Sequence, residues 1–166
     1  MRNFLSVILI FVILLTGTAC QEKPEEPVST VTVYYKASQI SYGTSDGVII
    51  PYALDATGHE ADNVYLLNTY FANIPPEKYA ATFPPSTRVV SLNLDGLTAK
   101  IVLNEEFAKL TGLNLSIACA CLTQTVIALT ECHEVIISAE NAQLDGNNFI
   151  TLNRDSYLLL DESGAD

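Results

Sequence analysis

Apolar side chains alternate with polar ones in some stretches of this chain and recur at helical spacing in others. The alternation over residues 31–35 predicts a strand, and the apolar run 48–50 predicts a second short strand that stops at Pro51. Residues 62–73 carry one apolar helical face, which predicts a helix that Pro75-Pro76 ends. The apolar face consists of Val64, Leu67, Phe71 and Ile74.

A β-hairpin is the clearest local pattern, and it follows an irregular stretch over residues 77–87. Residues 88–94 and 97–103 flank Asp95-Gly96, the pair that a two-residue type I′ turn prefers. That turn predicts three facing pairs on the core side: Leu94 with Leu97, Leu92 with Ala99, and Val90 with Ile101. The opposite face is expected to carry Ser91, Asn93, Thr98 and Lys100.

Two helical segments are predicted after the hairpin. Asn104 suits the cap of a short helical turn through Phe107, which Gly112 closes. Asn114 suits the cap of a longer helix that ends near Glu131. The buried stripe of this longer helix is expected to contain Leu115, Cys119, Leu122, Val126 and Leu129.

The remaining elements complete an α+β fold. The unbroken apolar run 135–137 predicts a central strand that is buried on both faces. Asp145-Gly146 predicts a turn, and residues 149–152 and 157–160 predict short terminal strands. This order of elements favours a mixed, mostly antiparallel sheet with two helices packed on one face.

The N-terminus has the pattern of an export signal. One cation, Arg2, precedes the apolar run 4–15, which is shorter than the roughly 20 apolar residues that span a bilayer. Small residues then lead to Cys20, which predicts a bacterial lipoprotein signal peptide over residues 1–19 and a lipid on the Cys20 thiol. An ordinary secretory peptide and an uncleaved anchor are the alternatives. Gly17 stands where such signals usually carry leucine.

Composition separates a linker from a single domain. Residues 20–30 are rich in proline and glutamate, which predicts a disordered, lipid-anchored linker. Residues 31–166 have the length of one domain with its own core. The chain carries a formal net charge of −11 with no dense cluster of lysine or arginine, so nucleic-acid binding is excluded as a function.

The three remaining cysteines are predicted to be free and buried. Cys119 and Cys121 lie two residues apart on the predicted helix, about 200° apart around its axis, so their side chains diverge. Cys132 lies too far along the same helix for a disulfide. Zinc binding by these residues and His133 is disfavoured, because the spacing matches no ligand pattern. No metal site is therefore predicted.

The pattern resembles the GerMN domain family over residues 31–140. The likeness rests on a set of stretches: Tyr65-Leu66-Leu67, residues 84–91, the Asp-Gly hairpin, residues 101–107, residues 122–126 and the strand at Val135. The resemblance implies a fold similar to ring-building motifs and a lipoprotein of the cell envelope. The family often has Pro-Gly or Gly where this chain has Glu131-Cys132-His133, and only one copy of the domain fits.

No catalytic signature is recognisable, so no catalytic residue, cofactor or enzymatic activity is predicted. Glu105-Glu106 are adjacent acids at a helix start, where they suit the helix dipole, and His59 and His133 have no orienting partner at a known spacing. Tyrosines at 34, 35, 65 and 70, with Phe71, either form a groove for glycan or peptide or belong to the core.

The function favoured by these observations is a binding or assembly module. It would be held by the lipid at Cys20 on the extracytoplasmic face of the cell membrane and would contact an envelope protein or cell-wall material, in sporulation, germination or other envelope complexes. An enzyme acting on peptidoglycan, or an accessory to one, is the alternative from another class. A small-ligand-binding lipoprotein is disfavoured, since a single domain offers no second lobe.

Overall fold

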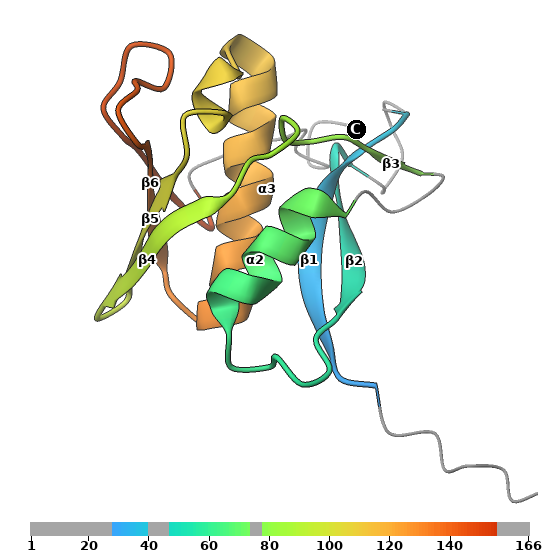
Figure 1. The fold of residues 1–166 in the computed structure, drawn as a ribbon. Helices are drawn as coiled ribbons and strands as arrows, with labels where there is room; N and C mark the ends of the chain where they lie inside the picture. Colours follow the sequence, from blue (N-terminus) through green and yellow to red (C-terminus); the bar gives the residue numbers. More distant parts are fainter. Residues whose placement is uncertain (1–27, 40–46, 74–77, 156–166) are drawn as a thin grey trace, which may run out of the picture.

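Two β-sheets enclose the two helices of this protein in a computed structural model that describes residues 28–39, 47–73 and 78–155 (Figure 1). Several predictions fall outside these residues: the signal peptide, Cys20 with most of the linker, Pro75-Pro76 and the strand at 157–160. Within them, the α+β class and a mixed, mostly antiparallel sheet are confirmed. A second sheet was not anticipated.

The second sheet has three antiparallel strands in the order β2-β1-β3. They are β1 (Thr30–Ala37), β2 (Ile49–Asp55) and β3 (Tyr79–Ala80), the last within a stretch expected to be irregular. The prediction that β2 stops at Pro51 was wrong. Pro51 pairs with Tyr34, whose N–H points away from β2 and donates to the Thr125 hydroxyl (3.0 Å). Pro51 therefore lies at a pair without ladder hydrogen bonds on an edge strand, where proline is tolerated.

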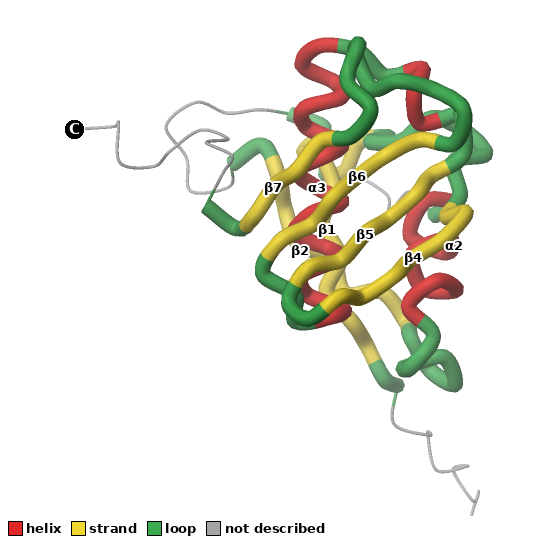
Figure 2. The backbone as a smooth tube through the Cα atoms, turned by 90° about the vertical axis from the view of Figure 1, so that its left-hand side faces the viewer, coloured by secondary structure: helices red, strands yellow, loops and turns green. Residues whose placement is uncertain are grey.

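The larger sheet has the order β4-β5-β6-β7 (Figure 2). Its strands are β4 (Val89–Asp95), β5 (Thr98–Leu103), β6 (Glu134–Ala139) and β7 (Ile150–Asn153). Only β5 and β6 are parallel to each other, since α3 connects them. The central position predicted for residues 135–137 is confirmed, but burial alternates along β6 rather than covering both faces.

The predicted hairpin exists with a register shifted by two residues. Asp95 pairs with Thr98, so Gly96 and Leu97 form the turn and Leu94 faces Ala99. Gly96 alone of the two turn residues has a positive φ (59°), which is the pattern of a type II′ rather than a type I′ turn. Of the six expected core residues, Ala99 and Ile101 are buried and Leu92 is half-buried. The exposed ones are Val90, Leu94 and Leu97, because Val90 is the extra residue of a bulge and Leu97 lies in the turn.

Both helices lie on the same side of the larger sheet, between it and the smaller one (Figures 1 and 2). Helix α2 (Asn63–Ala72) begins at Asp62, whose carboxylate accepts a hydrogen bond from the Tyr65 N–H (2.9 Å). Its buried residues are Leu66, Leu67, Tyr70 and Phe71. Val64, which was expected on this face, is exposed, and Ile74 lies outside the described residues.

Helix α3 (Gly112–Thr130) is the centre of the molecule. The predicted stripe is confirmed for Leu115, Cys119, Leu122 and Val126, and Leu129 is half-buried. Residues on the other sides of the helix are buried as well, because β1 covers the side that the larger sheet does not. Among the described helices, α3 is long and apolar enough to span a membrane, but most of it is buried inside this domain, as expected for a core helix.

The boundaries of the helical segments differ from the predicted ones. Thr111, not Asn114, precedes α3, and Gly112 begins this helix instead of closing the preceding one. The short helical turn is a 3₁₀ helix, η1 (Phe107–Lys109). Asn104 does not cap it with its side chain, which instead accepts from the Arg88 N–H (3.0 Å) and donates to the Ser86 carbonyl (2.9 Å). The end of β5 is thereby fastened to the start of β4.

Candidate functional site

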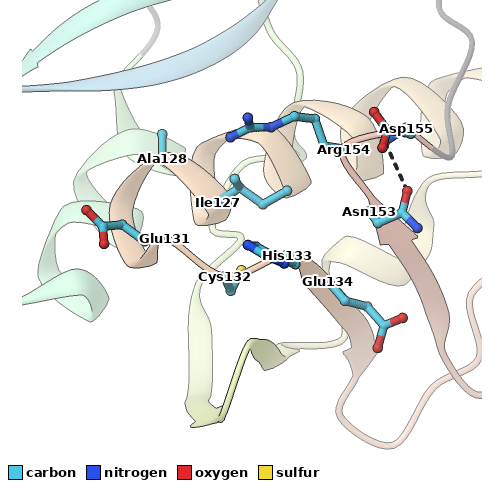
Figure 3. A pocket seen from close by; sticks show the side chains of 9 residues that line it. All are labelled: Ile127, Ala128, Glu131, Cys132, His133, Glu134, Asn153, Arg154 and Asp155. Carbon is cyan, nitrogen blue, oxygen red and sulfur yellow. Dashed lines mark hydrogen bonds between the residues drawn. The ribbon is translucent and has the colours of Figure 1, made fainter.

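A cleft of about 680 Å³ lies where α3 ends and β6 begins (Figure 3). The floor includes Ile127 and Ala128 of α3, and the walls come from the turn after the helix and from the end of β7. The wall residues are Glu131, Cys132, His133, Glu134, Asn153, Arg154 and Asp155. This volume is within the usual range for ligand pockets, about 300–1,000 Å³.

The end of α3 gives the cleft its shape. Glu131 has a left-handed backbone (φ 58°), and its N–H donates to the Ile127 carbonyl (2.9 Å), which closes the helix. The N–H groups of His133 and Glu134 then both donate to the Leu97 carbonyl (2.8 and 3.2 Å). Cys132 is buried between these anchors. These hydrogen bonds hold the turn in place, and the exposed side chains of Glu131 and His133 line the cleft.

The charges around the cleft are mixed. Glu131 and Glu134 provide carboxylates near the C-terminal end of α3, where the helix dipole favours cations. Arg154 and Asp155, just after β7, provide a guanidinium and a further carboxylate, and the Asp155 N–H donates to the Asn153 side chain (3.0 Å) (Figure 3). Such a lining suits a polar ligand or a protein segment that carries both charges.

A smaller cleft of about 330 Å³ lies at the other end of the molecule and includes Glu105 and Glu106. The Glu106 carboxylate binds the Lys109 ammonium (2.7 Å), and both residues lie at the start and end of η1. Glu106 thus has the structural role expected for an acid at a helix start. His133 lines the larger cleft, whereas the His59 ring stacks on the Tyr65 ring (centroids 3.6 Å apart) near the start of α2.

Most of the aromatic residues considered as a binding groove belong to the core. The Tyr35 hydroxyl donates to the carbonyls of Tyr70 (2.8 Å) and Asn73 (2.7 Å), and the Tyr70 hydroxyl donates to the Tyr34 carbonyl. Burial raises the pKa of both Tyr35 and Tyr70 well above the usual value. Phe71 is buried beside them, and only Tyr65 is exposed. The core interpretation is the correct one for Tyr35, Tyr70 and Phe71.

The thiols of Cys119, Cys121 and Cys132 are free and buried, as predicted. Burial raises the pKa of Cys119 to about 12 and also raises that of Cys121, so both stay protonated at neutral pH and are poor nucleophiles. No three histidine, cysteine, aspartate or glutamate side chains come together as a potential metal site within the part of the chain that the structure describes.

The outer face of the larger sheet is an open surface. No described helix covers it (Figure 2), and its exposed side chains include Asn93, Lys100 and Thr151. The predicted polar face is confirmed: Asn93 and Lys100 are exposed, and Ser91 and Thr98 are half-buried. Val102 and Ile136 are half-buried between them. The outer face thus combines half-buried apolar side chains at its centre with polar side chains around them.

Solved structures of similar shape identify the fold. The first GerMN domain of the sporulation protein GerM from Bacillus subtilis superposes with a TM-score of 0.56 over 80% of this chain and 98% of that domain. This chain has the fold of a GerMN domain. The tandem GerMN domains of the same protein match with a TM-score of 0.54 over 81% of this chain and 50% of theirs. The identities are 13% and 15%, so the likeness concerns the fold. No sequence family and no curated protein matches the chain.

The sequence indicated only part of the larger cleft of this GerMN-like domain. Its pattern marks Glu131-Cys132-His133 only as a departure from the family pattern. It gives no indication of Asn153, Arg154 and Asp155. They reach the cleft only because β7 pairs with β6, Asn153 opposite Glu134, which no local pattern reveals.

Proposed function

We propose that this protein is a lipid-anchored, extracytoplasmic module of the GerMN type that works by contact with another envelope protein. The observation that carries the proposal is the GerMN fold, which the chain shares with domains of a sporulation protein. A role in sporulation, germination or another envelope complex follows from that likeness. The predicted export signal and the predicted lipid at Cys20 support the proposed location.

The open outer face of the larger sheet is the proposed contact surface. Lys100 and Asp95 form an exposed ion pair on the hairpin (3.0 Å), and exposed pairs of this kind contribute little to stability. The two side chains are therefore available for recognition without a large cost to folding. The cleft at the end of α3 adjoins the same face, because Glu134 and Asn153 belong to both. One partner can thus contact the face and insert a polar segment into the cleft.

Photocrosslinking in intact cells tests the contact. A photoreactive phenylalanine analogue replaces Asn93 on the outer face or, as the matched control, Asn114 in the first turn of α3, since both asparagines are exposed. The proposal expects one defined adduct from position 93 and none from position 114, with the partner identified by mass spectrometry. Equal adducts from the two positions, or none from position 93, would contradict the outer face as the contact surface.

The anchor has its own test. Cys20→Ala removes the thiol that would carry the lipid. The proposal expects the variant to leave the processed membrane fraction, while wild-type protein stays in it and carries an acylated Cys20 by mass. A variant that behaves like wild type in size and location would mean that lipidation is not the anchor.

We also propose that the domain has no enzymatic activity. Support comes from the structural role of Glu106, from the high pKa of the Cys119 thiol and from the separation of His59 and His133 on different elements. The peptidoglycan enzyme considered above would have to use the larger cleft, where acids and an imidazole meet. Digestion of purified peptidoglycan by wild-type protein, abolished by Glu131→Gln in a folded variant, would overturn this proposal.

A further inference from the structure

Two pairs of exposed apolar side chains, one in the hairpin and one at the start of α2, lie at the end of the domain where β1 begins. Leu97 in the hairpin turn is 58% exposed, and Leu94 beside it is 53% exposed. Val64 and Tyr65 in the first turn of α2 are 39% and 44% exposed. We call these four residues the linker-end patch. Leu94 and Leu97 belong to the same hairpin, and exposed apolar side chains that form a continuous patch on a folded domain commonly mark a contact surface.

The pairing of the strands explains why these residues share one end of the molecule with the linker. Thr30, the first residue of β1, pairs with Asp55, the last of β2, and the loop after β2 leads directly to α2. The hairpin turn lies beside the end of α3, because the His133 N–H donates to the Leu97 carbonyl (2.8 Å). Figure 1 shows the start of β1, the start of α2, the end of α3 and the hairpin turn toward the lower end, and Figure 2 shows the same from a perpendicular view.

We propose that the linker-end patch rests on the lipid bilayer, with Leu94 and Leu97 inserted among the acyl chains. This inference depends on the proposed lipid anchor at Cys20. Seven residues lie between Cys20 and Val28, the first described residue, so the eight steps from Cys20 to Val28 span at most about 28 Å. The lipid would therefore hold this end of the domain nearest to the membrane.

Because the linker is short, even a weak contact between the linker-end patch and the bilayer would be occupied. A tethered group meets its binding surface at an effective concentration in the millimolar range, so a few apolar side chains gain occupancy that they would lack in free solution. Tyrosine at the edge of the patch also suits the membrane interface, where aromatic rings with a polar group collect. The patch thus completes an attachment that begins at Cys20.

The charges near the patch decide which lipid it fits. Asp95 next to the hairpin turn is neutralised by Lys100 (3.0 Å). Glu60 and Asp62 before α2 and Glu131 after α3 are exposed, so this end of the molecule is acidic. An acidic rim is repelled by anionic headgroups and accepted by zwitterionic ones. The patch is therefore expected to insert into phosphatidylcholine vesicles and to be displaced by anionic lipid.

Tryptophan fluorescence tests the contact, because the chain contains no tryptophan of its own. Leu97→Trp places the probe in the patch. Leu113→Trp is the matched control, since Leu113 is 72% exposed at the start of α3, the opposite end of the molecule. The full-length acylated variants are purified from membranes and reconstituted into phosphatidylcholine vesicles with or without bromine on the acyl chains, which quenches tryptophan by contact.

The expected result is emission from Leu97→Trp that falls about twofold or more in brominated vesicles, as for tryptophan at the interface, while Leu113→Trp is unchanged. Adding Leu94→Asp to Leu97→Trp should restore the emission. Equal emission of Leu97→Trp in both kinds of vesicle, with Cys20 acylated by mass, would overturn the docking and leave the anchor intact. Protein without acylated Cys20 that fails to stay on the vesicles would overturn the anchor and the docking with it.

Discussion

The two faces of the larger sheet use the same strands for different purposes. On the inner face, Ala99, Ile101, Val135 and Ile137 are at most 1% exposed and pack under the helices. On the outer face, Lys100 is exposed although it lies between Ala99 and Ile101 on β5, and its cross-strand partner Asn93 is exposed as well. In this sheet the core contacts are therefore concentrated on one face, and the polar side chains of the other remain open to solvent.

The largest expected effect comes from the helix that covers the inner face. Leu122 of α3 is fully buried, and Leu→Ala at such a position costs about 2–5 kcal/mol in free energy of unfolding. At about 2–4 °C per kcal/mol for a domain of this size, Leu122→Ala should lower the Tm by roughly 10 °C. Leu92→Ala should cost less, because Leu92 is only half-buried. Thermal unfolding followed by circular dichroism measures both, and equal effects would contradict the lower burial of Leu92.

A polar core residue gives the next largest effect. Asn104 is 4% exposed, and its side chain bonds to the Arg88 N–H and the Ser86 carbonyl. Asn104→Ala leaves two backbone groups without partners, at about 1–3 kcal/mol for each that stays buried. Asn93→Ala, which changes the same residue type on the outer face, is the control. Denaturant unfolding should show a lower midpoint for Asn104→Ala and an unchanged one for Asn93→Ala. An unchanged midpoint for Asn104→Ala would mean that the hydrogen bonds of the Asn104 side chain do not stabilise the fold.

The buried thiol of Cys119 makes stability depend on alkaline pH. Its pKa rises from 9.0 in the unfolded chain to about 12 in the folded domain, because burial disfavours the thiolate. The raised pKa stabilises the fold below pH 9, and this contribution is lost as the pH rises from 9 toward 12. When the pH is raised from 8 to 10, the Tm of the wild-type protein should fall further than the Tm of Cys119→Ala. Parallel losses in the two proteins would place the thiol in contact with water.

The two Asp-Gly pairs show where local sequence suffices and where it does not. Asp145 and Gly146 both have positive φ (50° and 83°) between the bridged residues Leu144 and Asn147, as the sequence predicted. At Asp95-Gly96 the turn lies one residue later than predicted: Gly96 and Leu97 form it, and Asp95 pairs with Thr98 as part of the strand. There β5 must also pair with β6, Thr98 opposite Glu134, and that long-range pairing is not encoded in the turn.

The second sheet and the cleft could not be predicted from the sequence for the same reason: both depend on contacts between residues far apart in the chain. The sequence predicted β1 and α3 separately, and nothing in either shows that Thr125 of α3 binds the edge of β1. One signal was available: no charged residue occurs between Gly112 and Thr130, and a helix that is apolar all round is buried on all sides. The residues of the cleft are joined only by strand pairing over long sequence distances, so local patterns left Arg154 and Asp155 unnoticed.

The central claim is that the outer face binds the partner without supporting the fold. Ser91→Ala, Asn93→Ala and Lys100→Ala are measured together for Tm and for capture of the crosslinked partner in intact cells. The account predicts unchanged Tm values, since exposed positions and surface ion pairs contribute about 0–1 kcal/mol, and reduced capture in at least one variant. Capture at the wild-type level in all three, with Tm unchanged, would contradict the account and place the interface elsewhere on the domain.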